Sequence, residues 1–328
     1  MKKSFYLLLT VFVLFTLFFA DQKAIAAGPV QIKVVGFAPK NHPLVPPIFE
    51  YIKMLNNGLK GEVQAKYVGG PEAIPASEQF EAVKNNIVQM VLLPAAYYIA
   101  ALPEGATRVL IRHENAMELR KSPYHDFLVK KHEEVGVRYL ATGLWNQFYT
   151  WTIKPVKSLQ DMKGLKMRSF FVYDRFQQAL GMTPVNIAVP EIYTALERGV
   201  VDGMMYPYIG PREQGFTKFL KYIVDHPFYK NDINILLNLA TWKKFSKSTQ
   251  ERFLEITAKE YDPYITDHAE KTVQAEMALL EKEGVKRFQL PPEEAKKYEA
   301  TAYRVKWEEI GEKIPAETLA KLKKLTGN

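Results

Sequence analysis

Two segments organise this chain: DMKGLKMR, residues 161–168, and PEIYTALERGVVDG, residues 190–203. The end of the first segment is expected to form a strand, and Arg168 lies near the end of that strand. The second is expected to form a helix over residues 190–198, with Gly199 as its stop signal, followed by a strand over residues 200–205. A strand, a helix and a strand in this order predict part of an α/β layered fold.

The same alternation continues on the N-terminal side of these segments. Residues 30–35 and 62–68 have the composition of strands, and residues 87–93 form the continuous apolar run that is typical of a buried parallel strand. Two extended runs, residues 137–153 and 233–242, are candidates for connections that cross between two halves of the molecule. The pattern alone does not distinguish two lobes around a cleft from two unrelated α/β domains.

The C-terminal part of the chain is expected to be mainly helical. Residues 246–283 have helical spacing that is interrupted around Asp262-Pro263, where a kink or two abutting helices are expected. A short edge strand over residues 284–290 precedes amphipathic helices over residues 292–311 and 315–325.

The N-terminus has the features of a cleavable secretory signal: a basic start, an apolar run over residues 5–20 and the small-residue site Ala24-Ile25-Ala26. We therefore expect residues 1–26 to be removed and the mature protein to be periplasmic, with an uncleaved membrane anchor as the alternative. The chain has no cysteine, which excludes disulfides and a lipid anchor on an N-terminal cysteine. Its net charge of +8 comes from basic residues scattered among acidic ones, which mildly favours anionic solutes and does not indicate a nucleic-acid partner.

The sequence lacks the motifs that mark common enzymes. The nucleophile elbow G-x-S-x-G, the zinc motif H-E-x-x-H, the phosphate-binding loop and the dinucleotide fingerprint are all absent. The six histidines do not pair at metal-ligand spacing. We therefore expect no enzymatic activity, no cofactor and no metal site, although a motif search cannot find two catalytic carboxylates that meet only in the fold.

The two opening segments, in this order, resemble the substrate-binding proteins of tripartite ATP-independent periplasmic (TRAP) transporters. The resemblance covers about residues 30–325 and is most specific over residues 154–203. It implies a periplasmic-binding-protein clamshell of two α/β domains, joined by crossing strands and a long helix, with solute in the cleft. It also implies that Arg168 holds the solute carboxylate, a role that suits a planar, permanently charged guanidinium. A surface Arg168 paired with an acidic residue is the alternative.

The resemblance also suggests domain limits. We expect a first domain of residues 27–145 with 234–270 and a second of residues 146–233 with 284–328. Residues 246–283 are expected to be the helical region that spans both.

Several positions of this chain differ from those of sugar-acid-binding members of that family. Phe148 stands where those members carry a second arginine, Phe171 replaces a polar amide, and Met204-Met205-Tyr206 replaces a polar run. Phe37 and Pro94 replace polar residues near the strand ends of the first domain. Unpaired polar groups in a closed cleft cost about 1–3 kcal/mol each, whereas aromatic side chains stack on apolar ligands. We therefore expect a monocarboxylate with an apolar or aromatic body; the alternative is that these aromatics are core residues around a small pocket.

The candidate binding site consists of Arg168 for the carboxylate, with Phe148, Phe171, Tyr206, Phe37 and Gln147 around the rest of the ligand. The expected function is that of an extracytoplasmic receptor, which binds an organic acid and delivers it to the membrane permease of a TRAP transporter. The alternatives are a ligand-sensing protein for a receptor kinase, a receptor for an ATP-driven importer and an enzyme.

Overall fold

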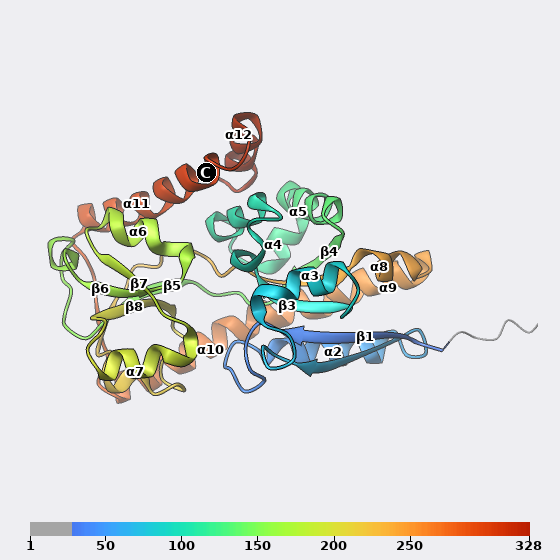
Figure 1. Ribbon diagram of the computed structural model, residues 1–328, viewed down its shortest axis with the longest axis horizontal. Helices are drawn as coiled ribbons and strands as arrows, with labels where there is room; N and C mark the ends of the chain where they lie inside the picture. The colour runs from blue at the N-terminus through green and yellow to red at the C-terminus, as the bar shows by residue number, and fades with distance from the viewer. Residues whose placement is uncertain (1–27) are drawn as a thin grey trace, which may run out of the picture.

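The protein folds into two lobes, each built around its own sheet (Figure 1). The computed structural model describes residues 28–328, apart from the side chain of Phe171. The expected signal peptide, residues 1–26, lies outside the described residues. None of the helices within residues 28–328 combines the length and apolar character needed to cross a bilayer.

Lobe 1 contains a five-stranded sheet in the order β2-β1-β3-β10-β4. β1 pairs in parallel with β2 and β3, and β10 runs antiparallel to β3 and β4. All residues of β3 and β10 are buried, as expected for central strands that are covered by helices on both faces. The strands are β1 (Val30–Gly36), β2 (Val63–Gly69), β3 (Met90–Pro94), β4 (Val137–Thr142) and β10 (Ile233–Asn238). The helices are α2 (Pro47–Gly58), α3 (Gln79–Lys84), α4 (Ala116–Lys121), α5 (Pro123–Glu134), α8 (Leu239–Lys244) and α9 (Lys247–Ile256).

Lobe 2 contains a six-stranded sheet in the order β11-β9-β5-β8-β6-β7. β6 is parallel to β7 and β8, whereas β5 is antiparallel to β8 and β9. The strands are β5 (Phe148–Thr152), β6 (Lys166–Ser169), β7 (Thr183–Asn186), β8 (Gly203–Pro207), β9 (Tyr222–Val224) and β11 (Lys286–Phe288). The helices α6 (Asp174–Ala179) and α7 (Ile192–Glu197) lie on opposite sides of this sheet in Figure 1.

Two chain segments between the sheets, residues 143–147 and 225–232, cross from one lobe to the other and form the hinge. They are joined by an isolated antiparallel bridge between Gln147 and Lys230 and by a 2.9 Å hydrogen bond from the Asn231 amide to the Asn146 carbonyl. The expectation that the second crossing extends over residues 233–242 is wrong. β10 ends at Asn238, whose side chain accepts a hydrogen bond from the Thr241 amide and begins α8 instead.

A long helix, α10 (Asp262–Lys282), runs from lobe 1 to lobe 2 (Figure 1). A π-helical turn over Thr257–Tyr261 joins it to α9, so the expected interruption at Asp262-Pro263 is confirmed. Pro263 lies in the first turn of α10, immediately after the π-helical turn.

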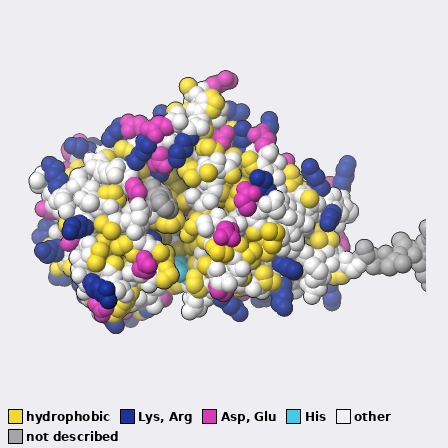
Figure 2. All heavy atoms as spheres, viewed as in Figure 1, with side chains coloured by type: hydrophobic (Ala, Val, Ile, Leu, Met, Phe, Trp, Pro, Cys, Tyr) yellow, Lys and Arg dark blue, Asp and Glu magenta, His cyan; other side chains and the backbone are white. Residues whose placement is uncertain are grey.

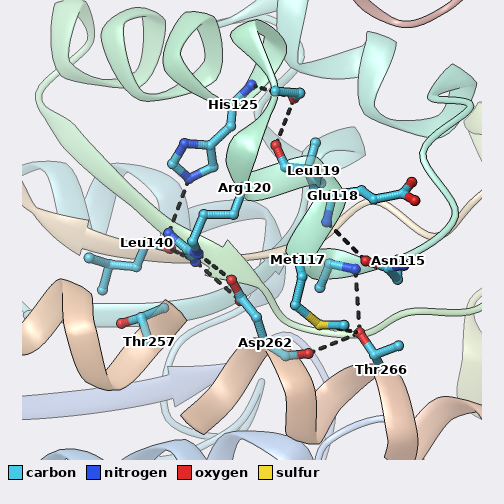
Figure 3. Close-up of polar contacts among 12 residues, drawn as sticks. Asn115, Met117, Glu118, Leu119, Arg120, His125, Leu140, Thr257, Asp262 and Thr266 are labelled. Atoms are coloured by element: carbon cyan, nitrogen blue, oxygen red, sulfur yellow. Dashed lines mark hydrogen bonds and ion pairs between the residues drawn. The ribbon is translucent and has the colours of Figure 1, made fainter. Parts of the chain in front are cut away.

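The start of α10 is attached to lobe 1 by a buried ion pair (Figure 3). Arg120 of α4 donates to both carboxylate oxygens of Asp262 and to the Leu140 carbonyl of β4, the last at 2.8 Å. The hydroxyl of Thr266, one turn further along α10, accepts the Ala116 amide at the start of α4. These contacts fix the first turns of α10 against lobe 1.

The C-terminal helices α11 (Pro292–Gly311) and α12 (Ala316–Leu325), expected in the second domain, contact both lobes. α11 packs against α6 of lobe 2 and against residues Pro103–Leu110 of lobe 1, and α12 contacts α5. The predicted clamshell of two α/β halves joined by crossing segments and a long helix is thereby confirmed. In Figure 2, Lys and Arg side chains are scattered over both lobes among Asp and Glu.

Candidate functional site

The candidate site lies where the carboxyl ends of parallel strands from the two lobes meet. β1 and β3 end at Gly36 and Pro94 in lobe 1, and β6 and β8 end at Ser169 and Pro207 in lobe 2. Ligands of open α/β sheets bind outside these ends of the strands, where the chain leaves the sheet. The two lobes touch here: the rings of Tyr97 and Phe170 lie 5.3 Å apart, and the Tyr206 hydroxyl lies 3.3 Å from His42 Nε2.

Arg168, the next-to-last residue of β6, is a buried cation at this junction, with 2% of its surface exposed. Its Nε donates to the Ile187 carbonyl at 3.0 Å, and its Nη1 donates to the Tyr173 hydroxyl at 3.1 Å. No carboxylate among residues 28–328 lies within 4.0 Å of the guanidinium, and Nη2 makes no hydrogen bond with the described residues. A buried guanidinium that is oriented by neutral groups and lacks an acidic partner is suited to bind a carboxylate from solution.

Aromatic side chains surround the guanidinium. The Phe170 ring lies 5.8 Å from its central carbon, and Tyr173, which accepts from Nη1, packs 5.7 Å from Phe148. Phe148 in turn lies 6.2 Å from Phe228 at the hinge. These rings form an apolar wall beside a single charged group.

Tyr206 bounds the other end of the site. It lies two residues beyond Met204, the β8 partner of Arg168 in the sheet, so the side chains of Arg168 and Tyr206 extend from the same face. Its hydroxyl contacts His42 from lobe 1 and the Gln214 amide from lobe 2. Tyr206 is therefore a polar group at a contact between the lobes.

Burial determines the protonation states in the site. It raises the pKa of Tyr97, Tyr173 and Tyr206, for Tyr173 to about 12, while the charge of Arg168 acts in the opposite direction on all three. Burial lowers the pKa of His42 to about 4. At neutral pH the tyrosines are therefore uncharged hydroxyls and His42 is a neutral imidazole.

The structure brings some of the predicted residues together and separates others. Arg168 and Tyr206 lie on neighbouring strands, Phe148 reaches Arg168 through Tyr173, and Phe37 lies 6.0 Å from His42. Gln147 is exposed at the hinge, where it lines a cavity of about 450 Å³ with Trp145 and Lys230, a cavity that Arg168 and Tyr206 do not line. The side chain of Phe171 lies outside the described residues.

Sequence reasoning missed His42, Tyr97, Phe170 and Tyr173. Tyr97 and His42 follow the ends of β3 and β1, and that position at a parallel strand end is the only signal that the sequence offered. Tyr173 was identifiable only from the fold, because its contact with Arg168 depends on how the chain turns after β6.

No metal site accompanies this arrangement. Among residues 28–328, no group of three or more His, Asp and Glu side chains could hold a metal ion. The chemistry that the described site offers is hydrogen-bond donation and one positive charge, which serve binding rather than bond cleavage.

Comparisons with known proteins agree with this architecture. The profile of the family described as bacterial extracellular solute-binding protein, family 7, matches residues 34–313. The chain is 24% identical over 315 residues to the C4-dicarboxylate-binding periplasmic protein of Rhodobacter capsulatus, with 92% of each chain covered. It is 25% identical over 199 residues to a monocarboxylate 2-oxoacid-binding periplasmic protein of Nostoc sp., covering 57% of this chain and 54% of that protein.

A solved structure extends the likeness to nearly the whole fold. A TRAP periplasmic solute-binding protein of Desulfovibrio salexigens with bound orotic acid superposes with a TM-score of 0.77 at 20% identity, covering 90% of this chain and 97% of that one. Among curated relatives, the chain spans about half the length of the first four that it matches, between 42% and 54%.

Proposed function

This chain belongs to bacterial extracellular solute-binding protein family 7, a family of binding proteins and not of enzymes, and we propose that it is the receptor of a TRAP transporter for an organic anion. The anion is a monocarboxylate with an apolar or aromatic body. Residues 1–26 act as a signal peptide that directs export and is then removed. In the periplasm the receptor closes around the anion and delivers it to the membrane permease.

The observation that carries this proposal is the unpaired charge of Arg168. A buried cation without a counter-ion is unfavourable, and a bound carboxylate supplies the missing charge together with acceptors for Nη1 and Nη2. In a protein whose only role for Arg168 was structural, an Asp or Glu side chain would be expected beside it.

The other contacts support an apolar ligand body. The described side chains that pair with the Arg168 guanidinium or with the rings and hydroxyls of Tyr173 and Tyr206 are aromatic residues, His42 and Gln214, and no second Lys or Arg is among them. A second carboxylate would therefore lack a cationic partner in the described site. Orotic acid, bound by the Desulfovibrio relative, and the 2-oxoacids named for the Nostoc relative are monocarboxylates.

The relatives named above are TRAP or periplasmic receptors, and they give no support to a receptor-kinase sensor or to an ATP-driven importer. The closure of two lobes around solute is the conformational signal that a permease can recognise.

A thermal-shift screen tests the proposal. Residues 27–328 are unfolded in denaturant, washed free of bound ligand, refolded and melted with aryl and branched-chain monocarboxylates, C4-dicarboxylates, sugar acids, neutral sugars and amino acids. A ligand that binds only the folded state raises the melting temperature by mass action. We expect the largest rise with an aryl or branched-chain monocarboxylate; a larger rise with a dicarboxylate or sugar acid would refute the apolar body, and no rise with any acid would refute the receptor function.

A further inference from the structure

The hydrogen-bond network around Tyr206 fixes the direction in which its hydroxyl donates. His42 Nδ1 accepts the Leu44 amide proton at 3.3 Å, so this ring nitrogen carries no proton. In a neutral imidazole the proton then resides on Nε2, which faces the Tyr206 hydroxyl oxygen at 3.3 Å. His42 is therefore the donor and Tyr206 the acceptor in this contact between the lobes.

The second neighbour of Tyr206 is a donor as well. Gln214 Nε2 donates to the Gly210 carbonyl at 3.3 Å, which fixes the orientation of the amide, and the same nitrogen lies 3.5 Å from the Tyr206 hydroxyl. The Tyr206 oxygen thus receives two protons, and its own proton has no acceptor among the described residues. Because Tyr206 is only 5% exposed, a hydroxyl proton without an acceptor there is unfavourable.

The hydroxyl proton of Tyr173 also lacks an acceptor among the described residues, for a different reason. Its oxygen accepts from Arg168 Nη1 at 3.1 Å, and a guanidinium cannot accept a hydrogen bond in return. Tyr173 is 3% exposed, and no described residue accepts its proton. Around Arg168, the site therefore offers two hydroxyl protons and the positive charge of the guanidinium, which together favour a ligand acceptor and disfavour an ammonium group.

We propose that the Tyr206 and Tyr173 hydroxyls, oriented by His42 and Arg168, donate to the ligand, so that the site selects a monocarboxylate with a carbonyl oxygen next to its carboxylate and rejects an ammonium group there. This inference rests on the proposed function and assigns the polar group of its ligand. His42 is a positioning residue, because it acts on the ligand only through Tyr206.

One candidate for an opposing acceptor is Asp232, a buried carboxylate of the hinge. It accepts the Ala96 amide at 3.1 Å and lines a small cavity with Val172 and Lys306. Arg168, Tyr173 and Tyr206 do not line that cavity. Asp232 therefore lines a separate cavity, although its charge also acts on Tyr97 and Tyr173.

The test compares acids that share a carbon skeleton and differ only next to the carboxylate. The branched set is 4-methyl-2-oxopentanoate, 4-methylpentanoate and L-leucine, and the aryl set is phenylpyruvate, 3-phenylpropionate and L-phenylalanine. Titration calorimetry on refolded residues 27–328 should give, in at least one set, a Kd at least tenfold lower for the oxo acid than for the plain acid, with the amino acid weakest.

Variants attribute that preference to the hydroxyls. Tyr206→Phe keeps the ring and removes the hydroxyl, so it should reduce the advantage of the oxo acid over the plain acid to less than threefold. His42→Leu should reduce the advantage as well, and Tyr173→Phe provides a second variant if Tyr206→Phe fails to fold. Tyr264→Phe, on α10 outside the site, is the matched control and should keep the full preference.

Two results would overturn the inference while leaving the receptor function intact: equal affinity for the plain and oxo acids, or tighter binding of the amino acid. An undiminished preference in both tyrosine variants would do the same. If none of the carboxylates in either set binds, the proposed monocarboxylate function itself fails, and this inference fails with it.

Discussion

Replacement of Arg168 by methionine should separate binding from stability. Methionine fills a similar volume without charge, so the variant loses the ion pair to the ligand carboxylate. Removal of one partner of a buried, hydrogen-bonded charge pair costs about 2–5 kcal/mol, which corresponds to roughly 30-fold to several-thousand-fold in Kd.

The same substitution should change the free energy of unfolding only slightly. The Ile187 carbonyl and the Tyr173 hydroxyl lose their donor, at about 1–3 kcal/mol for each group left unsatisfied. Against this, a 2% exposed guanidinium without a described counter-ion no longer has to be kept out of water, a relief of several kcal/mol. These two terms have opposite signs and similar size. We therefore expect the free energy of unfolding of Arg168→Met to differ from that of the original chain by only about 1–2 kcal/mol.

The assay combines titration calorimetry, with the acid that gives the largest thermal shift, and urea unfolding of the unliganded protein. Arg175→Met is the control: this arginine is seven residues away, pairs with Glu312 at 2.7 Å on the surface and should bind the acid within twofold of the original chain. A Kd of Arg168→Met within threefold of the original would refute the reasoning. So would a large loss of stability with unchanged affinity, because that is the behaviour of a purely structural arginine.

Contacts away from the site yield further expected outcomes. Gly203→Ala should lower the urea midpoint by an amount equivalent to about 1–3 kcal/mol, because its Cβ would meet the Trp151 carbonyl oxygen of the neighbouring strand; an unchanged midpoint would contradict this. Arg120→Ala should destabilise by about 3–5 kcal/mol because it leaves the buried Asp262 carboxylate unpaired, and adding Asp262→Ala should restore part of the loss; strictly additive losses would argue against the pair. Burial lowers the pKa of His132 to about 4, so the unfolded chain, with a pKa of about 6.5, binds the proton more tightly. Neutral His132 therefore contributes about 3 kcal/mol to the free energy of unfolding above pH 6.5, and this contribution is lost as the pH falls toward 4. Over that pH range the urea midpoint of His132→Gln should fall less steeply than that of the original chain, and equal slopes for the two proteins would contradict this.

The sequence predicted elements whose signals are local. Gly199 was expected to stop a helix, and it adopts a left-handed backbone, with φ of 63°, just after the end of α7. The alternation of strands and helices around Arg168 was predictable for the same reason. Each of these features depends on a few consecutive residues.

The errors arose where local preference and tertiary context disagree. β7 was not predicted, because it has four residues and contains Pro184, yet proline is tolerated there since β7 is an edge strand of its sheet. The run over residues 233–242 is apolar throughout, so hydrophobicity could not show that β10 gives way to α8 at Asn238. The capping pattern of Asn238 with Thr241 was the only available signal.

The site itself was predictable only in part, because binding in this fold depends on contacts between distant segments. Arg168 lies in a contiguous motif. His42 and Tyr97, in contrast, come from beyond strand ends in the other lobe and contact Tyr206 and Phe170. No periodicity connects these positions, since their proximity exists only when the lobes touch.

That contact between lobes explains how an unpaired arginine can serve a receptor. When His42 meets Tyr206 and Tyr97 meets Phe170, Arg168 is removed from water, which is unfavourable for a cation without a counter-ion. In the proposed receptor, a carboxylate bound to Arg168 would cancel that penalty in the closed arrangement, and it would therefore bind the closed lobes more tightly than open ones. A ligand shifts a conformational equilibrium by its difference in affinity for the two states, and no more. If Arg168 binds the anion as proposed, its missing acidic partner would couple closure to the arrival of the anion, and an aspartate beside it would be expected to permit closure without cargo.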